Sequence, residues 1–438
     1  MSEVVGTAQQ GLAGKYPPYP EYKDSGVTWL GHIPAQWSLK KLKYLCSIQT
    51  GNKDTVNAED DGEYPFFVRS QTVERIGTYT ADCEAVLTAG DGVGVGKVYH
   101  YYNGKFDYHQ RVYMLSDFTR VTGRFVYYYL SSNFYKVALE GNAKSTVDSL
   151  RLPQFLNFEF SIPPLDTQDV IVAFLDYETA RIDRLIAQQQ RLIELLKEKR
   201  QAVISHAVTK GINPDAPMKD SGVEWLGQVP EHWSVIYIKH LSEVKRGASP
   251  RPIDDPKYFD EDGEYAWTRI ADVSNAGMYL TSTTQRLSAL GSSLSVRLNA
   301  GELFLSIAGT VGKPCITIFK SCIHDGFVYF PSLKINNKFF YYIFDAGQAY
   351  LGLGKMGTQL NLNTETVGGI KIGLPPVDEI ENIIGHIEQQ KEKYEKLISK
   401  ASDTIELLQE RRTALISAAV TGKIDLRGWT QPAEEVAA

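Results

Sequence analysis

The sequence predicts an α+β protein in which an antiparallel coiled coil of two long helices separates two α/β domains in a pseudo-two-fold arrangement. An internal repeat is the first observation behind this prediction: residues 23–38 read KDSGVTWLGHIPAQWS and residues 219–234 read KDSGVEWLGQVPEHWS. The second is a pair of similar blocks with heptad spacing, at 162–212 and 374–424. Because such self-similarity indicates a duplicated architecture, we expect two copies of a KDSGV segment, a variable domain and a helix.

The repeat divides the chain into six segments. The variable part of the second copy is longer than that of the first by 16 residues. We expect an N-terminal extension over 1–22, a first domain over 23–164, a first helix over 165–212, a second domain over 213–376, a second helix over 377–423 and a C-terminal tail over 424–438.

Local signals predict a long helix in each shared block. A Pro-Pro pair precedes each block, where a helix cannot yet have begun, and Gly211 and Gly422 stand where C-terminal glycines belong. About 44 residues separate these signals, which corresponds to about 65 Å of helix. Acidic residues with the spacing of an N-cap and the third helical position stand at the start of each block: Asp166 with Asp169, and Asp378 with Glu381.

The apolar residues of both blocks recur in heptads. A narrow seam of this kind favours pairing of one helix with the other. The alternative, two core helices inside a larger domain, is disfavoured by their length. The seam consists of Leu175, Ile182, Leu196 and Val203 with Leu185/Ile186 and Leu192/Ile193 on the first helix, and of Ile387, Tyr394, Leu408 and Leu415 with Leu397/Ile398 and Ile405 on the second; Gln189 and Ala401 interrupt it.

The variable segments have the pattern of mixed domains. Short β-branched and aromatic runs between turn signals predict strands at Tyr64–Val68 and Tyr265–Trp267. A Tyr- and Phe-rich stretch predicts a helix over Arg124–Leu139, with a counterpart over Asn337–Tyr350.

Composition limits the class of protein. The formal net charge of −6 argues against a promiscuous nucleic-acid binder but permits local basic sites. The four cysteines are scattered without a CxxC pair, so a reducing, cytoplasmic location is expected. Neither a signal peptide nor an apolar stretch long enough to span a membrane is predicted.

Three duplicated features resemble the specificity subunits of type I restriction–modification enzymes over nearly the whole chain. They are the KDSGVxWLGxxPxxW segments, the Pro-Pro-Leu/Val that closes each variable domain, and the IELLxExRxAxIS helices that end in Val-Thr. The resemblance implies a non-catalytic chain with two target recognition domains that bind double-stranded DNA. It also implies assembly with two methyltransferase subunits and two restriction/translocase subunits. S-adenosylmethionine, ATP and Mg²⁺ would be bound by those subunits, and no cofactor by this chain.

Two recognition domains held apart by a rigid spacer would read two half-sites whose separation the spacer sets. Because the two variable domains differ, we expect an asymmetric bipartite site with an unread gap. The exposed helix positions Arg181, Arg184, Lys197 and Lys199 are ordinary solvated surface or, in this family, a docking face for the methyltransferase subunits.

Base reading requires hydrogen-bond donors and acceptors on loops that face the major groove, with Arg or Lys suited to guanine and Asn or Gln to adenine. Any one such residue can equally be a solvated surface residue or contact only phosphate. The candidates for DNA contact are Lys53, Arg69, Gln71, Lys97, His109, Gln110, Arg111 and Lys144 in the first domain, and Arg246, Arg251, Arg269, Lys313, His324, Lys355 and Gln359 in the second.

Two motifs admit other interpretations. The Gly-rich segments Gly90–Lys97 and Ile307–Pro314 lack the residues of a nucleotide-binding phosphate loop, so each is expected to be a tight inter-strand turn that can also present Lys97 or Lys313 to DNA. The tryptophans of the KDSGV segments could stack on nucleic acid, but their recurrence with fixed proline spacing favours packing.

Two other function classes remain as alternatives. A fused methyltransferase is disfavoured because the Pro-Pro pairs lack the preceding Asn or Asp that grips a flipped adenine, and a fused nuclease because no convincing acidic motif is present. A coiled-coil scaffold with two domains for ligands other than DNA is kept open by the negative charge.

Overall fold

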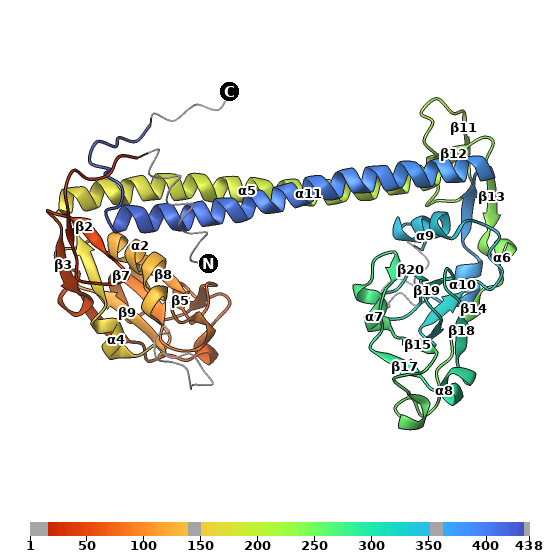
Figure 1. The fold of residues 1–438 in the computed structure, drawn as a ribbon, viewed down its shortest axis with the longest axis horizontal. Coiled ribbons are helices and arrows are strands. Elements are labelled where there is room, and N and C mark those ends of the chain that lie inside the picture. Colours follow the sequence, from red (N-terminus) through yellow and green to blue (C-terminus); the bar gives the residue numbers. More distant parts are fainter. Residues whose placement is uncertain (1–15, 139–149, 351–361, 433–438) are drawn as a thin grey trace. The chain divides into compact units, whose positions relative to one another are not determined.

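In a computed structural model that describes residues 16–138, 150–350 and 362–432, the chain forms two compact units (Figure 1). Unit 1 consists of Met1–Gln190 and Ser402–Ala438, and unit 2 consists of Arg191–Ala401. The two long helices, α5 (Leu165–Lys210) and α11 (Val377–Val420), are divided between the units. Each unit therefore contains one variable domain and a half of both helices.

A six-stranded sheet forms the centre of unit 1, in the order β4-β9-β7-β8-β5-β6. Its strands pair antiparallel except β5 and β8, which run parallel with Phe66 opposite Asp107. The predicted strand at Tyr64–Val68 is β5. The strands are β4 (Ser47–Thr50), β5 (Tyr64–Phe67), β6 (Glu74–Ile76), β7 (Ala81–Ala89), β8 (Tyr99–Tyr108) and β9 (Val112–Ser116).

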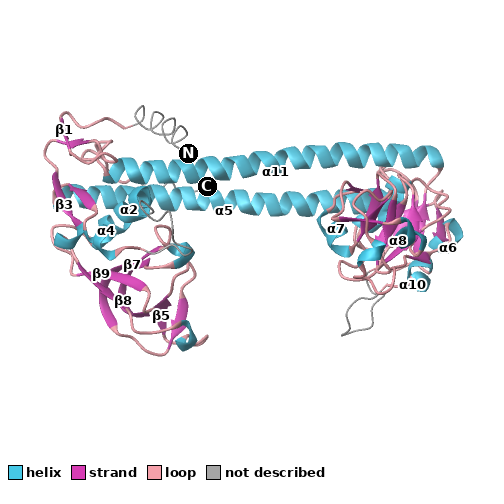
Figure 2. Cartoon of the chain, turned by 60° about the horizontal axis from the view of Figure 1, so that its bottom comes forward, coloured by secondary structure: helices cyan, strands magenta, loops and turns pink. Residues whose placement is uncertain are grey.

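Helix α2 (Gly123–Asn133) packs on β7 and β8 (Figures 1 and 2). The Thr122 hydroxyl caps it by accepting the N–H of Phe125 at 3.3 Å. The predicted helix over Arg124–Leu139 is interrupted at Phe134, and α3 follows. The shorter helices of unit 1 are η1 (Leu42–Tyr44), η2 (Thr55–Asn57), η3 (Gly92–Gly94), α3 (Tyr135–Ala138) and α4 (Leu152–Leu156).

Unit 2 contains a five-stranded sheet, β14-β22-β19-β20-β16, and a four-stranded sheet, β17-β15-β21-β18. Strand β15 confirms the prediction at Tyr265–Trp267 to within one residue. The strands are β14 (Lys245–Arg246), β15 (Tyr265–Thr268), β16 (Tyr279–Leu280), β17 (Gln285–Leu287), β18 (Val296–Leu298), β19 (Leu303–Ser306), β20 (Pro314–Thr317), β21 (Ser321–Ile323) and β22 (Phe327–Tyr329).

Helix α9 (Asn337–Asp345) is the predicted counterpart of α2, but it is shorter than the expected Asn337–Tyr350. The chain turns away soon after its end, where Gly347 adopts a left-handed φ of 75°. The other short helices of unit 2 are α6 (Ile238–Leu241), η4 (Pro256–Tyr258), α7 (Ile270–Asn275), α8 (Ala289–Ser293) and α10 (Thr364–Gly368).

The KDSGV segments fold into the same hairpin in both units. Strand β1 (Tyr22–Asp24) pairs with β2 (His32–Pro34), and β11 (Met218–Asp220) pairs with β12 (Gln228–Pro230) in the same register. Trp37 and Trp233, which follow these hairpins, are 0% and 1% exposed, so the predicted packing role is confirmed. A second small sheet closes each domain before its long helix: β3 (Ser38–Lys41) with β10 (Glu159–Ile162), and β13 (Ser234–Tyr237) with β23 (Lys371–Leu374).

Helices α5 and α11 are 46 and 44 residues long, close to the predicted length of about 44. Gly211 and Gly422 follow their last turns with φ of 72° and 71°, as expected for C-terminal glycines. The predicted N-caps are wrong by two positions, because α5 begins at Leu165 and α11 at Val377, which makes Pro164 and Pro376 the N-cap residues. Asp166 and Asp378 thus lie inside the first turns, where their charge favours the positive end of the helix dipole.

The two helices pack antiparallel. In unit 1, Arg412 of α11 forms a forked ion pair with Asp183 of α5, at 2.9 Å from Nε to Oδ1 and 3.3 Å from Nη2 to Oδ2. In unit 2, Nη1 of Arg200 in α5 lies 3.8 Å from Oε1 of Glu395 in α11. Late residues of one helix therefore face early residues of the other. The fold class predicted from the repeat, two α/β domains with a pair of long antiparallel helices, is confirmed.

The seam between the helices differs in detail from the predicted heptads. Leu185 and Leu192 are 37% and 43% exposed, whereas their neighbours Ile186 and Ile193 are half-buried. Ala401 is buried and Gln189 half-buried, so both positions belong to the seam that they were expected to interrupt. Only one residue of each adjacent apolar pair can face the partner helix, and the sequence does not indicate which one.

The serine of the repeated Ile-Ser of the long helices makes an equivalent hydrogen bond with each domain. In unit 1, the Ser417 hydroxyl of α11 donates a hydrogen bond to Asn133 Oδ1 at the end of α2, at 2.9 Å. In unit 2, the Ser205 hydroxyl of α5 donates to Gln348 Oε1, just after α9, at 2.8 Å. A helix end and a domain are thus linked by a hydrogen bond in each unit, which is buried in unit 1 and partly buried in unit 2.

Replacing either serine should destabilise only its own unit. Ser417→Ala and Ser205→Ala each remove one hydrogen bond from an amide oxygen, of buried Asn133 and of half-buried Gln348 respectively, which costs about 1 kcal/mol of unfolding free energy. Hydrogen exchange followed by mass spectrometry should show faster exchange in α2 for Ser417→Ala and in α9 for Ser205→Ala. Thr413→Ala, which alters an exposed hydroxyl one turn from Ser417, is the control. Equal effects of all three variants would contradict the assignment.

Candidate DNA interface

In unit 1, the Gly-rich turn between β7 and β8 joins two of the predicted arginines. The Asp91 carboxylate of this turn accepts a hydrogen bond from Arg69 Nη1 at 2.8 Å and another from Arg111 Nη1 at 2.7 Å. Arg69 follows β5 and Arg111 precedes β9, so three loops meet at one carboxylate. The arginine side chains stay accessible at 40% and 59% exposure, whereas Asp91 is 20% exposed.

The turn before β9 contains the predicted residues His109 and Gln110. His109 is only 2% exposed, and its Nδ1 accepts the backbone N–H of Arg111 at 3.0 Å. The neutral ring therefore carries its proton on Nε2, which lies 3.9 Å from Asp54 Oδ1. Gln110 is exposed and donates to the other oxygen of Asp54 at 2.6 Å. His109 shapes this turn from inside, and Gln110 lies on its surface.

Charge pairing sets the protonation of this cluster. Burial alone would raise the pKa of Asp91, but the hydrogen bonds and positive charges of Arg69 and Arg111 outweigh it and hold this pKa below its usual value. Burial lowers the pKa of His109, and the charges of Arg69 and Arg111 lower it further against the opposite effect of Asp54 and Asp91. At neutral pH the carboxylate is therefore charged and the imidazole is neutral.

The other described candidates of unit 1 lie around this cluster. The backbone of Lys53 forms an isolated parallel β-bridge with that of His109. The Lys53 side chain reaches Asp107, with Nζ 4.0 Å from Oδ2. Gln71 donates to the carbonyl of Lys97 at 3.5 Å, and both residues line a pocket of about 180 Å³ that Arg412 of α11 also lines.

Unit 2 contains a turn of the same construction before β22. The N–H of His324 donates to Thr268 at the end of β15, as the N–H of His109 donates to Phe67 at the end of β5. His324 Nδ1 accepts the N–H of Gly326 at 2.9 Å, the same i to i+2 contact that His109 makes with Arg111. Asp325 consequently occupies the place that Gln110 has in unit 1.

Asp325 accepts hydrogen bonds from two more of the predicted residues, Arg251 and Arg246. Its Oδ2 accepts from Arg251 Nη2 at 2.7 Å, and its backbone carbonyl accepts from Arg246 Nε at 2.6 Å. Ser249 Oγ donates to the remaining carboxylate oxygen at 3.1 Å. Burial lowers the pKa of His324, and the positive charges of Arg251, Arg246 and Arg269 lower it further against Asp325.

The other two described candidates of unit 2, Arg269 and Lys313, make no hydrogen bond to Asp325 in the described part of the chain. Arg269 Nη2 donates to Thr284 Oγ1 at 2.5 Å, and Lys313 Nζ donates to the carbonyl of Ser274 at 2.8 Å. Both Gly-rich segments join consecutive strands, β7 to β8 and β19 to β20, as predicted. Lys144, Lys355 and Gln359 lie outside the described residues.

Comparison with known protein families settles the identity of the fold. The family model described as the type I restriction modification DNA specificity domain matches residues 34–195 and again residues 230–416. The chain belongs to the type I restriction–modification specificity subunits. The resemblance inferred from the duplicated motifs is thereby confirmed, and specificity subunits are the non-catalytic members of their complexes.

Curated relatives and solved structures agree with this assignment. The specificity subunit of Escherichia coli EcoDI is 27% identical over 241 residues, about half of each chain, at 52% and 53%. The MjaVIII specificity subunit of Methanocaldococcus jannaschii is 22% identical over 90% of this chain and 94% of its own.

Two solved structures share the fold at 15% identity. A chain from a study of complex assembly and conformational transition of the type I restriction–modification system superimposes with a TM-score of 0.66 over 89% of this specificity subunit and 98% of that chain. The specificity subunit of Thermoanaerobacter tengcongensis superimposes with a TM-score of 0.54 over 90% and 98%.

Asp91 is a functional residue that the candidates for DNA contact did not include. The structure places it between Arg69 and Arg111, as it places Asp325 beside Arg251 and Arg246. Asp91 stands in the Gly-rich segment, where a carboxylate between glycines was the available signal. Asp325 directly follows His324 in a polar stretch of the sequence, which indicates it more plainly.

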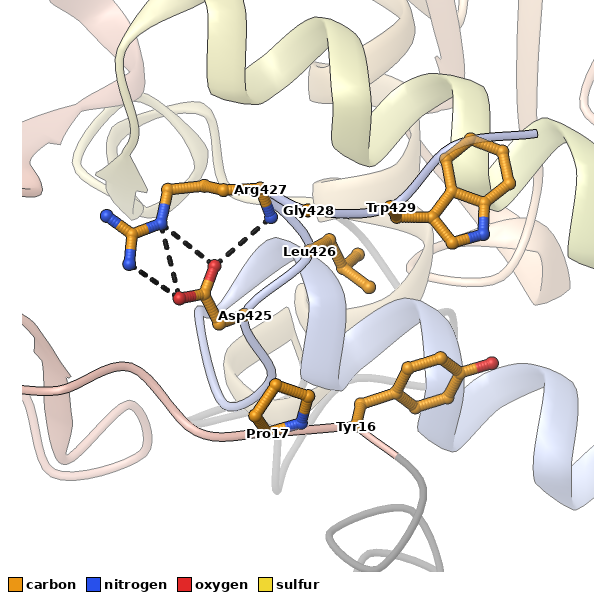
Figure 3. A pocket seen from close by; sticks show the side chains of 7 residues that line it. All are labelled: Tyr16, Pro17, Asp425, Leu426, Arg427, Gly428 and Trp429. Carbon is orange, nitrogen blue, oxygen red and sulfur yellow. Dashed lines mark hydrogen bonds and ion pairs between the residues drawn. The ribbon is translucent and has the colours of Figure 1, made fainter.

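The described parts of the specificity subunit outside these turns offer no competing chemistry. Within 16–138, 150–350 and 362–432, no group of three or more His, Cys, Asp and Glu residues could hold a metal ion, and no helix is long and apolar enough to cross a membrane. A pocket of about 620 Å³ lies in unit 1 between Tyr16–Pro17 and Asp425–Trp429 (Figure 3). There Arg427 and Asp425 point toward each other, and the Trp429 ring lies 5.4 Å from that of Phe174. None of the predicted DNA-contact residues lines this pocket.

The two turn histidines should titrate below ordinary histidine values. Arg69→Ala removes one of the positive charges beside His109, so the pKa of this imidazole should rise, while that of His324 stays constant. ¹⁵N-detected NMR titration of histidine-labelled protein measures both pKa values and the Nε2–H tautomer. Lys105→Ala, which removes an exposed cation elsewhere in unit 1, is the control. A His109 pKa unchanged by Arg69→Ala would contradict the electrostatic account.

Proposed function

We propose that this specificity subunit directs a methyltransferase to an asymmetric bipartite DNA site, with one half-site read by each unit. One observation carries the proposal: an equivalent histidine turn occurs in both units but presents different side chains. Unit 1 presents Gln110 and Arg111 at this turn, and unit 2 presents Asp325 with Arg251 and Arg246. Equivalent scaffolds with different donors are what two different half-sites require.

The remaining candidates extend these two surfaces. Lys53, Gln71 and Lys97 surround the unit 1 turn, and Arg269 and Lys313 belong to the same domain as the unit 2 turn. Lys144, Lys355 and Gln359 stay predictions from the sequence. His109 contributes by shaping its turn, since a side chain this buried presents no edge to DNA.

The long helices serve in this proposal as the spacer and as the docking face for the methyltransferase and restriction subunits. Large apolar side chains point away from the seam, as expected for a surface that binds partner proteins. They are Leu185 (37% exposed), Leu192 (43%), Leu195 (45%), Leu397 (40%) and Leu407 (65%).

The complex would act in the cytoplasm on double-stranded DNA. We infer that S-adenosylmethionine, ATP and Mg²⁺ are bound by the partner subunits, of which there would be two of each kind. The boundaries predicted for the target recognition domains, 23–164 and 213–376, and for the spacer helices, 165–212 and 377–423, complete this proposal.

Genome-wide methylation mapping tests the central claim. The chain is co-expressed with its cognate methyltransferase subunit, and methylated adenines are located by single-molecule sequencing. A single asymmetric motif with an unread gap is the expected result. The same strain without the specificity subunit should show no such motif. A continuous motif, or none in the presence of both subunits, would refute the proposal.

Lengthening the helices should lengthen the gap. Seven residues inserted between Arg184 and Leu195 of α5, with seven more between Ala401 and Glu410 of α11, add about 10 Å. This corresponds to about 3 base pairs of DNA, with both half-sites unchanged. Seven residues inserted at Asn213–Ala216, between α5 and β11, should leave the gap as it was. Changed half-sites would show that the helices do not act as a spacer.

A further inference from the structure

Arg69, Asp91 and Arg111 of unit 1 form an arrangement that the need for positive charge alone does not explain. A carboxylate between two arginines reduces the formal charge of the group to +1. The neighbouring His109 adds none, because its pKa is lowered. A surface that only attracts phosphate gains from every added cation and loses from every anion. Asp91 therefore has a role other than attraction to the DNA backbone.

That role is to fix the direction of both guanidinium groups. Each arginine uses a single nitrogen, Nη1, on its own oxygen of Asp91, at 2.8 Å for Arg69 and 2.7 Å for Arg111. No other hydrogen bond joins these guanidinium groups to the part of the chain that the structure describes. Nη2 and Nε of both side chains stay available as donors. A planar guanidinium held in this way loses little rotamer entropy when it binds.

The Gly-rich turn is built to bring Asp91 to this position. A side chain at Gly94 would place its Cβ 2.6 Å from the carbonyl oxygen of Arg69, closer than real contacts allow. Gly92, directly after Asp91, has a left-handed φ of 76°, which a residue with a side chain rarely adopts. The glycines thus allow the turn to pack against the arginine that its aspartate holds.

A fixed pair of parallel donors matches one base edge best. Guanine presents two acceptors in the major groove, O6 and N7, and a bidentate arginine is its commonest specific partner. Adenine presents one acceptor and one donor there, and cytosine presents a donor, so neither accepts two guanidinium hydrogens. We propose that Arg69 and Arg111, held by Asp91, read guanine in the half-site of unit 1, with Asp91 as a positioning residue.

This inference rests on the proposed function and adds to it the base that is read and the residue that fixes the reading geometry. It predicts at least one G·C pair in the half-site of unit 1. It also predicts that loss of Asp91 affects base discrimination more than total DNA affinity.

The test uses the specificity subunit assembled with its methyltransferase subunits, first by methylation mapping. Arg69→Ala or Arg111→Ala should relax the preference at a G·C position of one half-site by about 10-fold or more. Asp91→Asn should relax the same positions, and the other half-site should stay intact in every variant, which shows that the complex is folded. Lys43→Ala, which removes an exposed cation of unit 1, is the control and should leave all base preferences unchanged.

Binding to synthetic duplexes isolates the guanine contact. Replacing the guanine by 7-deazaguanine removes the N7 acceptor, so it should weaken binding of the wild-type complex several-fold. It should have no further effect on the arginine variant that has lost this contact. Asp91→Asn should reduce the penalty of the replacement without weakening total affinity, since it raises the formal charge of the group from +1 to +2.

Three results would overturn the inference while leaving the bipartite site in place. The first is a unit 1 half-site without guanine on either strand. The second is arginine variants that lower methylation at all sites alike. The third is an Asp91→Asn variant that binds every duplex more tightly with unchanged base preference, as a purely electrostatic role requires. The absence of any gapped motif in the wild-type complex would instead refute the proposed function.

Discussion

The insertion of both long-helix ends into the cores of the domains is the constraint on which the rest of the structure depends. In unit 1, Ile171 and Leu175 of α5 and Leu415 and Ala419 of α11 share one buried cluster with α2 and the closing strands. In unit 2, the end of α5 and the start of α11 do the same around α9. Each domain is therefore completed by residues of both helices. Within each unit, the domain is consequently joined to the long helices by core packing rather than by a flexible linker.

Paired charges make the proposed DNA recognition compatible with the net charge of −6. The arginines at the two histidine turns are held by Asp91 and Asp325, so the positive charge proposed for recognition lies in a few oriented groups. A surface with few such groups attracts DNA weakly without regard to sequence. The partner subunits of the complex would supply further phosphate contacts, and this chain would contribute mainly to discrimination between bases.

The repeat made the architecture predictable, but contact geometry was not accessible from the sequence. Pro-Pro pairs and C-terminal glycines located α5 and α11 within one or two residues, because these are local backbone restrictions. The choice between Leu185 and Ile186 at the seam depends on the partner helix, and the seven-residue pattern allowed either. Likewise, His109 looked like a surface donor, yet backbone contacts with Phe67 and Arg111 hold it in the interior. The sequence offered both His109 and His324 as candidates, but their equivalence within the fold rests on backbone hydrogen bonds with Phe67 and Thr268.

The closure of unit 1 by the far end of the chain has a consequence for biosynthesis. The Tyr22 hydroxyl donates to the carbonyl of Gly422 at 3.0 Å, and Lys423 Nζ reaches the carbonyls of Leu30 and His32. Unit 2 is continuous in sequence, whereas the core of unit 1 includes Leu415 to Leu426, which are synthesised after all of unit 2. During synthesis unit 2 can therefore be completed before unit 1, which is the reverse of the usual N-terminal-first order. A chain that stopped before Leu415 would leave the apolar residues that pack on this segment uncovered, and would become a substrate for chaperones and proteases.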